Sequence, residues 1–134
     1  MGCDAHIFME GYELDTDKGW ELLKEFKVHF RNYEYFGHIA GVRGDGPYDE
    51  AAWHPMEASE ASLGIRLNGI GHDLGWMRVE DFLEVSRKFA DSDRGICPEH
   101  VKNLISDVEM WCEMVERMPE FENVLTRVVI FFDS

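Results

Sequence analysis

An aspartate and a histidine stand two residues apart near the start of the chain, in the stretch MGCDAHIFME. In residues 3–10, apolar side chains alternate with mostly polar ones, which is the period of a β-strand. Asp4 and His6 are therefore expected on one face of the strand, about 7 Å apart. A carboxylate and an imidazole at this separation can turn toward one divalent metal ion. The expected third ligand is His72, in a glycine-rich stretch with Asp73 beside it. The competing interpretation is that Asp4 and His6 only solvate the outer face of a terminal strand.

Arginine and aromatic residues indicate a second kind of site. A guanidinium group binds phosphate oxygens through two parallel hydrogen bonds, and an aromatic ring stacks on a nucleotide base. The predicted ligand-binding residues for a small anionic molecule are Arg31, Tyr33, Arg43 and Trp76. The alternatives are that the arginines pair with surface carboxylates and that the tyrosine belongs to the core. Residues 44–49, GDGPYD, lack both the P-loop lysine and the GxGxxG turn of dinucleotide-binding proteins.

The three cysteines Cys3, Cys97 and Cys112 are widely spaced and contain no CxxC pair. This pattern predicts neither a disulfide framework nor a structural zinc site, and it favours the reducing cytoplasm. Cys3 shares a strand face with Ala5 and Ile7, which predicts a buried thiol that reacts slowly.

The negative net charge of the chain argues against nucleic acids as direct partners. The chain has 13 Lys and Arg against 27 Asp and Glu, a net charge of −14, which repels nucleic-acid phosphates. No apolar stretch is long enough to cross a bilayer, so no membrane association is expected either. The excess acid is explained by solvated helix faces, or by an acidic surface that docks on a host protein.

The hydrophobic pattern predicts an α+β fold, with residues 1–134 as a single domain and no internal repeat. Strands are expected at 3–10, at 19–27 after the turn DTDKG, and at 123–133, together forming a small, mostly antiparallel sheet. Helices are expected at 30–41, 79–89 and 98–118, the last with an apolar stripe that packs on the sheet. Residues 42–78 show little periodicity and are expected to form a long irregular loop, which in compact domains is often functional.

The stretches MGCDAH, RNYEYFGHIAGVRG, GIGHDLGWMRVEDF and RVVIFFDS occur in an order that resembles a family of small, uncharacterised bacteriophage and bacterial proteins. Members begin Met-Gly-Cys-Asp-Ile-His. The positions that match the family pattern are Cys3, Asp4, His6, Arg31, Asn32, Tyr33, Gly41, Val42, Arg43, His72 and Trp76. The chain departs from the pattern at three positions, where Leu74, Gly75 and Arg78 replace a second His, a Ser and a Thr. A mechanism that requires this second His would therefore be absent. The resemblance implies a shared fold and a phage-type origin, with the host cytosol as the compartment, but no particular reaction.

Three functions of different classes follow. The favoured one is a protein that binds a small anionic ligand, such as a nucleotide, and in a phage sequesters a defence signal. The second is a metal-dependent hydrolase in which Asp4, His6 and His72 hold a divalent cation that activates water. The third is an acidic inhibitor of a host protein. The catalytic residues, if any, and the oligomeric state do not follow from the sequence.

Overall fold

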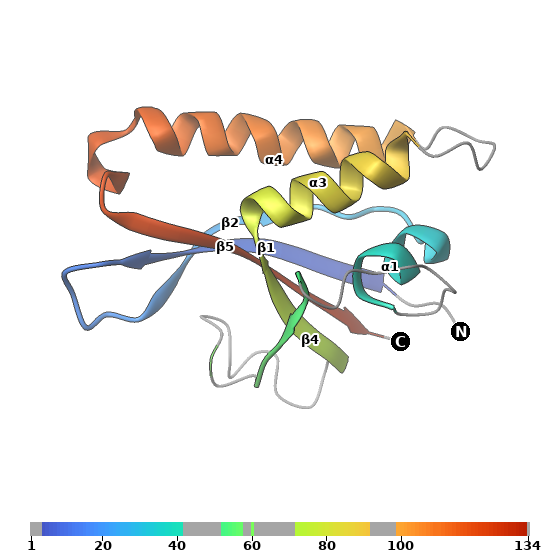
Figure 1. Ribbon diagram of the computed structural model, residues 1–134, viewed down its shortest axis with the longest axis horizontal. Helices are drawn as coiled ribbons and strands as arrows, with labels where there is room; N and C mark the ends of the chain where they lie inside the picture. The colour runs from blue at the N-terminus through green and yellow to red at the C-terminus, as the bar shows by residue number, and fades with distance from the viewer. Residues whose placement is uncertain (1–3, 42–51, 58–59, 61–71, 92–98, 134) are drawn as a thin grey trace.

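The computed structural model describes residues 4–41, 52–57, 60, 72–91 and 99–133, and for Tyr33, Glu34 and His72 it describes the backbone alone. Figure 1 shows one sheet with helices packed along it. The strands are β1 (Asp4–Glu13), β2 (Trp20–Phe26), β3 (His54–Pro55), β4 (His72–Arg78) and β5 (Val124–Asp133). The helices are α1 (Tyr33–Ala40), α3 (Val79–Ala90) and α4 (Glu99–Arg117), followed by the short 3-10 helix η2 (Pro119–Phe121). The fold is therefore α+β, as the sequence predicts.

The sheet has the strand order β2-β1-β5-β4-β3, and each neighbouring pair is antiparallel. β1 and β2 form the predicted hairpin, whose turn ends at Gly19 with a φ of 75°, a conformation that glycine adopts without strain. β5 pairs with β1 along its whole length, from Asp4 opposite Asp133 to Glu13 opposite Val124. The two ends of the chain therefore lie side by side in the sheet, and the prediction that residues 123–133 join the hairpin is confirmed.

The helices α1, α3 and α4 cover one face of the sheet. The apolar stripe of α4 is buried, from Val101 and Leu104 through Val108 to Val115, because these residues recur at helical spacing. Of these, Val101, Leu104 and Val108 belong to the main core, together with Ala5, Ile7 and Met9 of β1 and alternate residues of β5. α1 begins at Tyr33 rather than at residue 30, because the Asn32 side chain accepts a hydrogen bond from the backbone of Tyr35 and caps the helix.

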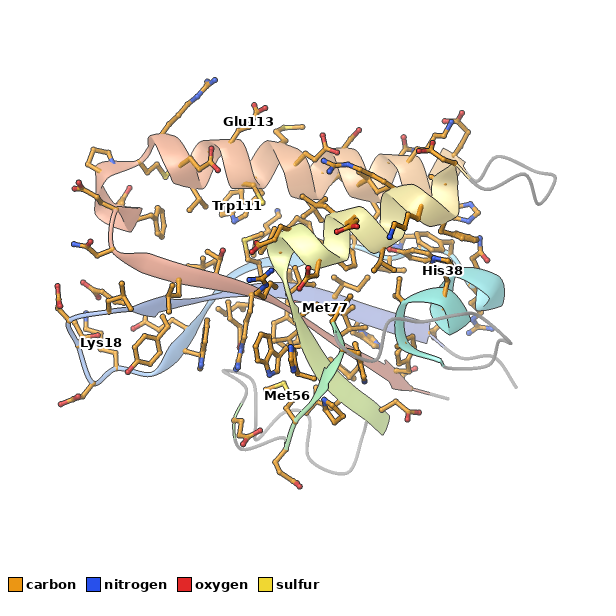
Figure 2. All side chains as sticks on the ribbon, viewed as in Figure 1. Lys18, His38, Met56, Met77, Trp111 and Glu113 are labelled. Atoms are coloured by element: carbon orange, nitrogen blue, oxygen red, sulfur yellow. The ribbon has the colours of Figure 1, made fainter. Side chains whose placement is uncertain are left out.

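The other face of the sheet holds a smaller apolar cluster built on Phe8, Val129 and Phe131, with Met56, Leu74 and Trp76 packed against it. Figure 2 shows Met56 on the side of the sheet away from α4. Each side of the strand pair β1–β5 is therefore covered by apolar groups, which explains why residues 128–132 are apolar at every position.

The expectation of a continuous irregular loop over residues 42–78 is wrong for its last part. His72–Arg78 is strand β4, which pairs with β5, and His54–Pro55 pairs with β4 at the edge. An irregularity between His72 and Gly75, where Asp73 has a φ of 53°, interrupts the alternation from which a strand is recognised in sequence. His72 consequently begins a strand and does not lie on a loop.

Among the helices that the structure describes, none is both long and apolar enough to cross a bilayer.

Candidate functional site

Polar side chains gather where β1 begins and β5 ends. The register places Asp4 directly opposite Asp133, and two like charges in such a pair repel each other. Each carboxylate instead has a cationic or hydrogen-bonding partner of its own. Asp4 pairs with Arg31, and Asp133 pairs with His6. These four side chains form the candidate site and are called the terminal polar cluster below.

The pair of Arg31 and Asp4 is held by two hydrogen bonds. The arginine Nε donates to Oδ1 over 2.7 Å and Nη2 donates to Oδ2 over 3.3 Å, the fork geometry in which guanidinium binds a carboxylate or a phosphate. The side chains of Arg31 and Asp4 are 54% and 47% exposed, so solvent and solutes reach both. The hydrogen bond from Arg31 is the main reason that the pKa of Asp4 lies below its usual value, and the charges of Arg31 and His6 lower it further.

His6 is held by a hydrogen bond and by a ring contact. Its Nε2 lies 2.6 Å from Oδ2 of Asp133, and its ring stacks on Phe131 with centroids 4.6 Å apart and an interplanar angle of 9°. Within the described part of the chain, no residue forms a hydrogen bond with the other ring nitrogen, Nδ1. When Nε2 donates to Asp133, Nδ1 of the neutral ring carries a lone pair that accepts a proton or a hydrogen bond.

The segment before α1 positions Arg31. Next to Arg31, the Asn32 side chain caps α1, and its Nδ2 lies 3.1 Å from Nε2 of His100 at the start of α4. On the other side, the ring of Phe30 lies 4.3 Å from that of His100. Arg31 is therefore flanked by two residues that bind α4, and this restricts where its guanidinium group can lie.

The structure brings three of the predicted site residues together: Asp4, His6 and Arg31. The backbone of His72 pairs with Phe132, one residue from the His6 partner Phe131, so β5 separates His72 from His6. Since neighbouring strands lie about 4.8 Å apart, the two histidine backbones are about 10 Å apart. The side chain of His72 is not described, so its joint role with Asp4 and His6 stays a prediction.

The other predicted ligand-binding residues lie elsewhere or outside the described residues. Trp76 pairs with Val129, four residues along β5 from Asp133, which is about 13 Å at the rise of a strand. Its ring stacks on His54, with centroids 4.3 Å apart. The side chain of Tyr33 at the start of α1 is not described, and Arg43 lies outside the described residues, as do Cys3 and Cys97. The predicted ligand roles of Tyr33, Arg43 and Trp76 thus stay predictions.

A metal site needs several ligands that converge. Among the side chains that the structure describes, no group of three or more His, Cys, Asp or Glu is arranged to hold a metal ion. Asp4 and His6 point to Arg31 and Asp133 instead of to a common point. For a divalent cation to bind there, both would have to exchange these partners, and His72 or another residue would have to complete the set.

The sequence interpretation missed one member of the terminal polar cluster, Asp133, and one buried pair elsewhere in the sheet. Asp133 was not considered, because its closeness to His6 arises from strand pairing between the two ends of the chain. Glu10 and Arg127 form a salt bridge of 2.8 Å with both side chains buried. A signal for this pair exists: Arg127 is the one basic residue in the apolar run 124–132, which suggests a specific partner.

Comparisons with models of protein families, with curated proteins and with solved structures found no match to this chain.

Proposed function

We propose that the terminal polar cluster binds a small anionic ligand, with a nucleotide as the class to test first. The observation that carries the proposal is that two hydrogen-bonding groups at the end of the sheet, the guanidinium of Arg31 and the imidazole of His6, are each oriented by a carboxylate. Asp4 holds the guanidinium of Arg31, and Asp133 holds the imidazole of His6. Groups oriented before binding lose less conformational entropy when the ligand arrives.

The two oriented groups match two parts of a nucleotide. Arg31 supplies a planar cation for phosphate oxygens. Nδ1 of His6 accepts a hydrogen bond from a hydroxyl group such as that of a ribose, or donates to the phosphate when the ring is protonated. Sequestration of a nucleotide signal in counter-defence is the biological setting that we propose, because the sequence resembles phage proteins.

The test is a binding titration with a matched control. Isothermal titration calorimetry with a panel of linear and cyclic nucleotides, guided by mass spectrometry of molecules that copurify with the protein, identifies the ligand. Arg31→Gln is expected to weaken binding by about tenfold or more, because a charge-assisted fork to the ligand is lost. Arg87→Gln is the control, since Arg87 forms a comparable exposed pair with Glu109 at 2.9 Å, with side chains 53% and 43% exposed. Equal affinity of wild type and Arg31→Gln, or equal loss in both variants, would contradict the proposal.

A second candidate function is hydrolysis, and the 2.6 Å contact of His6 with Asp133 favours it. A carboxylate that orients an imidazole is the arrangement of a general base. In this reaction Nδ1 of His6 takes a proton from water, the water oxygen bonds to the phosphorus or carbonyl carbon of the ligand, and the leaving group departs with its electron pair. In the metal-dependent form that the sequence suggests, Asp4, His6 and His72 would hold a divalent cation, which would supply activation of the water in place of the His6 base.

A measurement of product formation distinguishes ligand binding from hydrolysis. If the protein is a hydrolase, His6→Gln removes product formation while His54→Gln, which changes a histidine stacked on Trp76, preserves it. Loss of turnover with a chelator, restored by a divalent metal, would assign the reaction to the metal-dependent form. Intact ligand recovered after prolonged incubation would leave binding without hydrolysis as the function.

A further inference from the structure

A groove lies between the edge strand β2 and helix α4, away from the terminal polar cluster. It has a volume of about 310 Å³. Its walls come from the end of β2 and the residue that follows it, and from one side of α4. The lining residues are Lys24, Glu25, Phe26, Lys27, Asp107, Met110, Trp111 and Met114.

Strand β2, which borders this groove, lies at the edge of the described sheet. β2 is the first strand in the order β2-β1-β5-β4-β3, and within the described residues it pairs with β1 alone. The outer N–H and C=O groups of an edge strand are a template for a further strand. A peptide that added to β2 would place alternate side chains on the face of the sheet that α4 covers, which is where the groove lies.

The α4 wall presents apolar groups and a donor that has no acceptor among the described residues. Met110 is 58% exposed and Met114 is 39% exposed, which is unusual for large apolar side chains on one helix side. Figure 2 shows Trp111 between α4 and the sheet. The indole Nε1 of Trp111 is buried and, among the described residues, has no hydrogen-bond partner. An unpaired buried donor is costly, so an oxygen atom brought in by a ligand is stabilised there.

The groove lining contains two lysines and two acidic residues. Lys24 lies over the ring of Trp111, 5.8 Å from its centroid, and Lys27 follows at the end of the strand. Glu25 and Asp107 also line the groove, yet neither lysine forms a salt bridge within the part of the chain that the structure describes. In a chain with 27 acidic residues and a net charge of −14, these two lysines, which form no salt bridge with the described residues, are the groups in the groove that can bind a carboxylate of a partner.

We propose that this groove binds an extended acidic peptide of a partner protein, which pairs with β2 as an outer strand. Apolar side chains of the peptide contact Met110, Met114 and Trp111. A carboxylate between them binds Lys24 and Lys27, and a peptide oxygen accepts from the Trp111 indole when the flexible Lys24 side chain moves toward the carboxylate. The proposal is independent of the anionic ligand at the terminal polar cluster, because the two sites share no residue.

The test starts from a library of random peptides of seven residues, the length of β2, selected on the purified full chain. Enriched sequences are expected to alternate apolar residues with Asp or Glu. A synthetic enriched peptide is then titrated against variants, and Lys24→Glu/Lys27→Glu is expected to weaken binding by about tenfold or more, whereas Lys24→Arg/Lys27→Arg binds within about threefold of wild type. Lys18→Glu/Lys88→Glu is the control for net charge, since these lysines form salt bridges in the hairpin turn and on α3.

Strand addition has its own readout. The same peptide with N-methyl groups on alternate amides, on the side that would pair with β2, is expected to lose binding because the methyl groups remove the backbone hydrogen bonds. Hydrogen exchange of β2 amides should slow when the unmethylated peptide is bound. The proposal would be overturned if the selection enriched no peptide, or if the enriched peptides contained no carboxylates. It would also be overturned if Lys24→Glu/Lys27→Glu and Lys18→Glu/Lys88→Glu bound the peptide equally well, or if the methylated peptide bound fully.

Discussion

Arg127 and Glu10 form a buried ion pair on the face of the sheet that the helices do not cover. Nε and Nη2 of Arg127 lie 2.9 and 2.8 Å from Oε1 of Glu10, and Nη2 also donates to the backbone oxygen of Glu60 over 2.8 Å. The guanidinium lies over Trp20, 3.9 Å from the ring centroid, and 5.6 Å from that of Trp76. A single arginine thus connects β1, β2, β4, β5 and the segment at Glu60.

Removing the cation of this pair should be strongly destabilising. Arg127→Met leaves the Glu10 carboxylate buried without its cation, and we expect the free energy of unfolding to fall by about 3–5 kcal/mol. The measurement is urea denaturation followed by circular dichroism. Arg87→Met, at an exposed pair, should cost only about 0–1 kcal/mol. The double variant Glu10→Leu/Arg127→Met should recover part of the loss, and an effect of Arg127→Met no larger than that of Arg87→Met would argue against a buried pair.

The Asp4–Arg31 pair predicts a pH dependence whose sign follows from the lowered pKa. The folded pKa of Asp4 lies below its ordinary value of 3.8, mainly because Arg31 donates a hydrogen bond to it. The stabilisation is therefore present above the ordinary pKa and is lost as the pH falls through the folded pKa. Asp4→Asn should be less stable than wild type at pH 7, and the difference should disappear near about pH 2. Urea midpoints at both pH values measure it, with Asp15→Asn in the exposed turn as the control. A difference that grew on acidification would contradict the assigned pair.

At the scale of elements, β4 depends on a close contact between its backbone and a buried tryptophan. Gly75 in β4 lies against Trp53, and a Cβ atom on Gly75 would come within 2.3 to 2.8 Å of three atoms of that ring. Such distances are not tolerated, so glycine at this position allows the segment around β3 to pack on β4. Because β4 carries His72 and Trp76, this contact also determines where two of the predicted site residues lie.

Gly75→Ala should therefore destabilise the fold by about 1–3 kcal/mol, the usual cost of an overpacked core. Urea denaturation measures this loss. The diagnostic is a double-mutant cycle with Trp53→Leu, which removes the ring that the new methyl group would meet. We expect the double variant to be more stable than the sum of the two single changes predicts. Strict additivity would mean that the two residues are not in contact.

The whole molecule carries a net charge of −14, and its self-repulsion opposes folding. Several acidic residues lie on the solvated side of α4, where Figure 2 shows Glu113 directed away from the sheet. Added salt screens this repulsion, since the Debye length falls from about 30 Å at 0.01 M to about 10 Å at 0.1 M. We expect the midpoint of thermal unfolding to rise by a few degrees over this range of sodium chloride. Calorimetry measures the shift, potassium chloride should have the same effect, and a fall in the midpoint would show that attractive ion pairs dominate instead.

The sequence by itself determined the elements with clear local patterns. The alternation of Ala5, Ile7 and Met9 indicated β1, and the helical spacing of Val101, Leu104 and Val108 indicated α4, because each pattern reflects which side of one element is buried. The α+β class and the pairing of the hairpin with β5 followed from these elements. β4 was missed because the irregularity at Asp73 and the glycine at position 75 interrupt its alternation over a short segment.

Only the tertiary structure decided the partners of the polar residues. Asp4 and His6 were correctly singled out as neighbours, but Arg31 and Asp133 reach them from 27 and 127 residues away, through a helix cap and through strand pairing. The same holds for Glu10 with Arg127 and for the groove between β2 and α4, whose walls are far apart in the chain. Spacing along a sequence specifies which residues share a face of one element, whereas the packing of elements against one another specifies which charges meet.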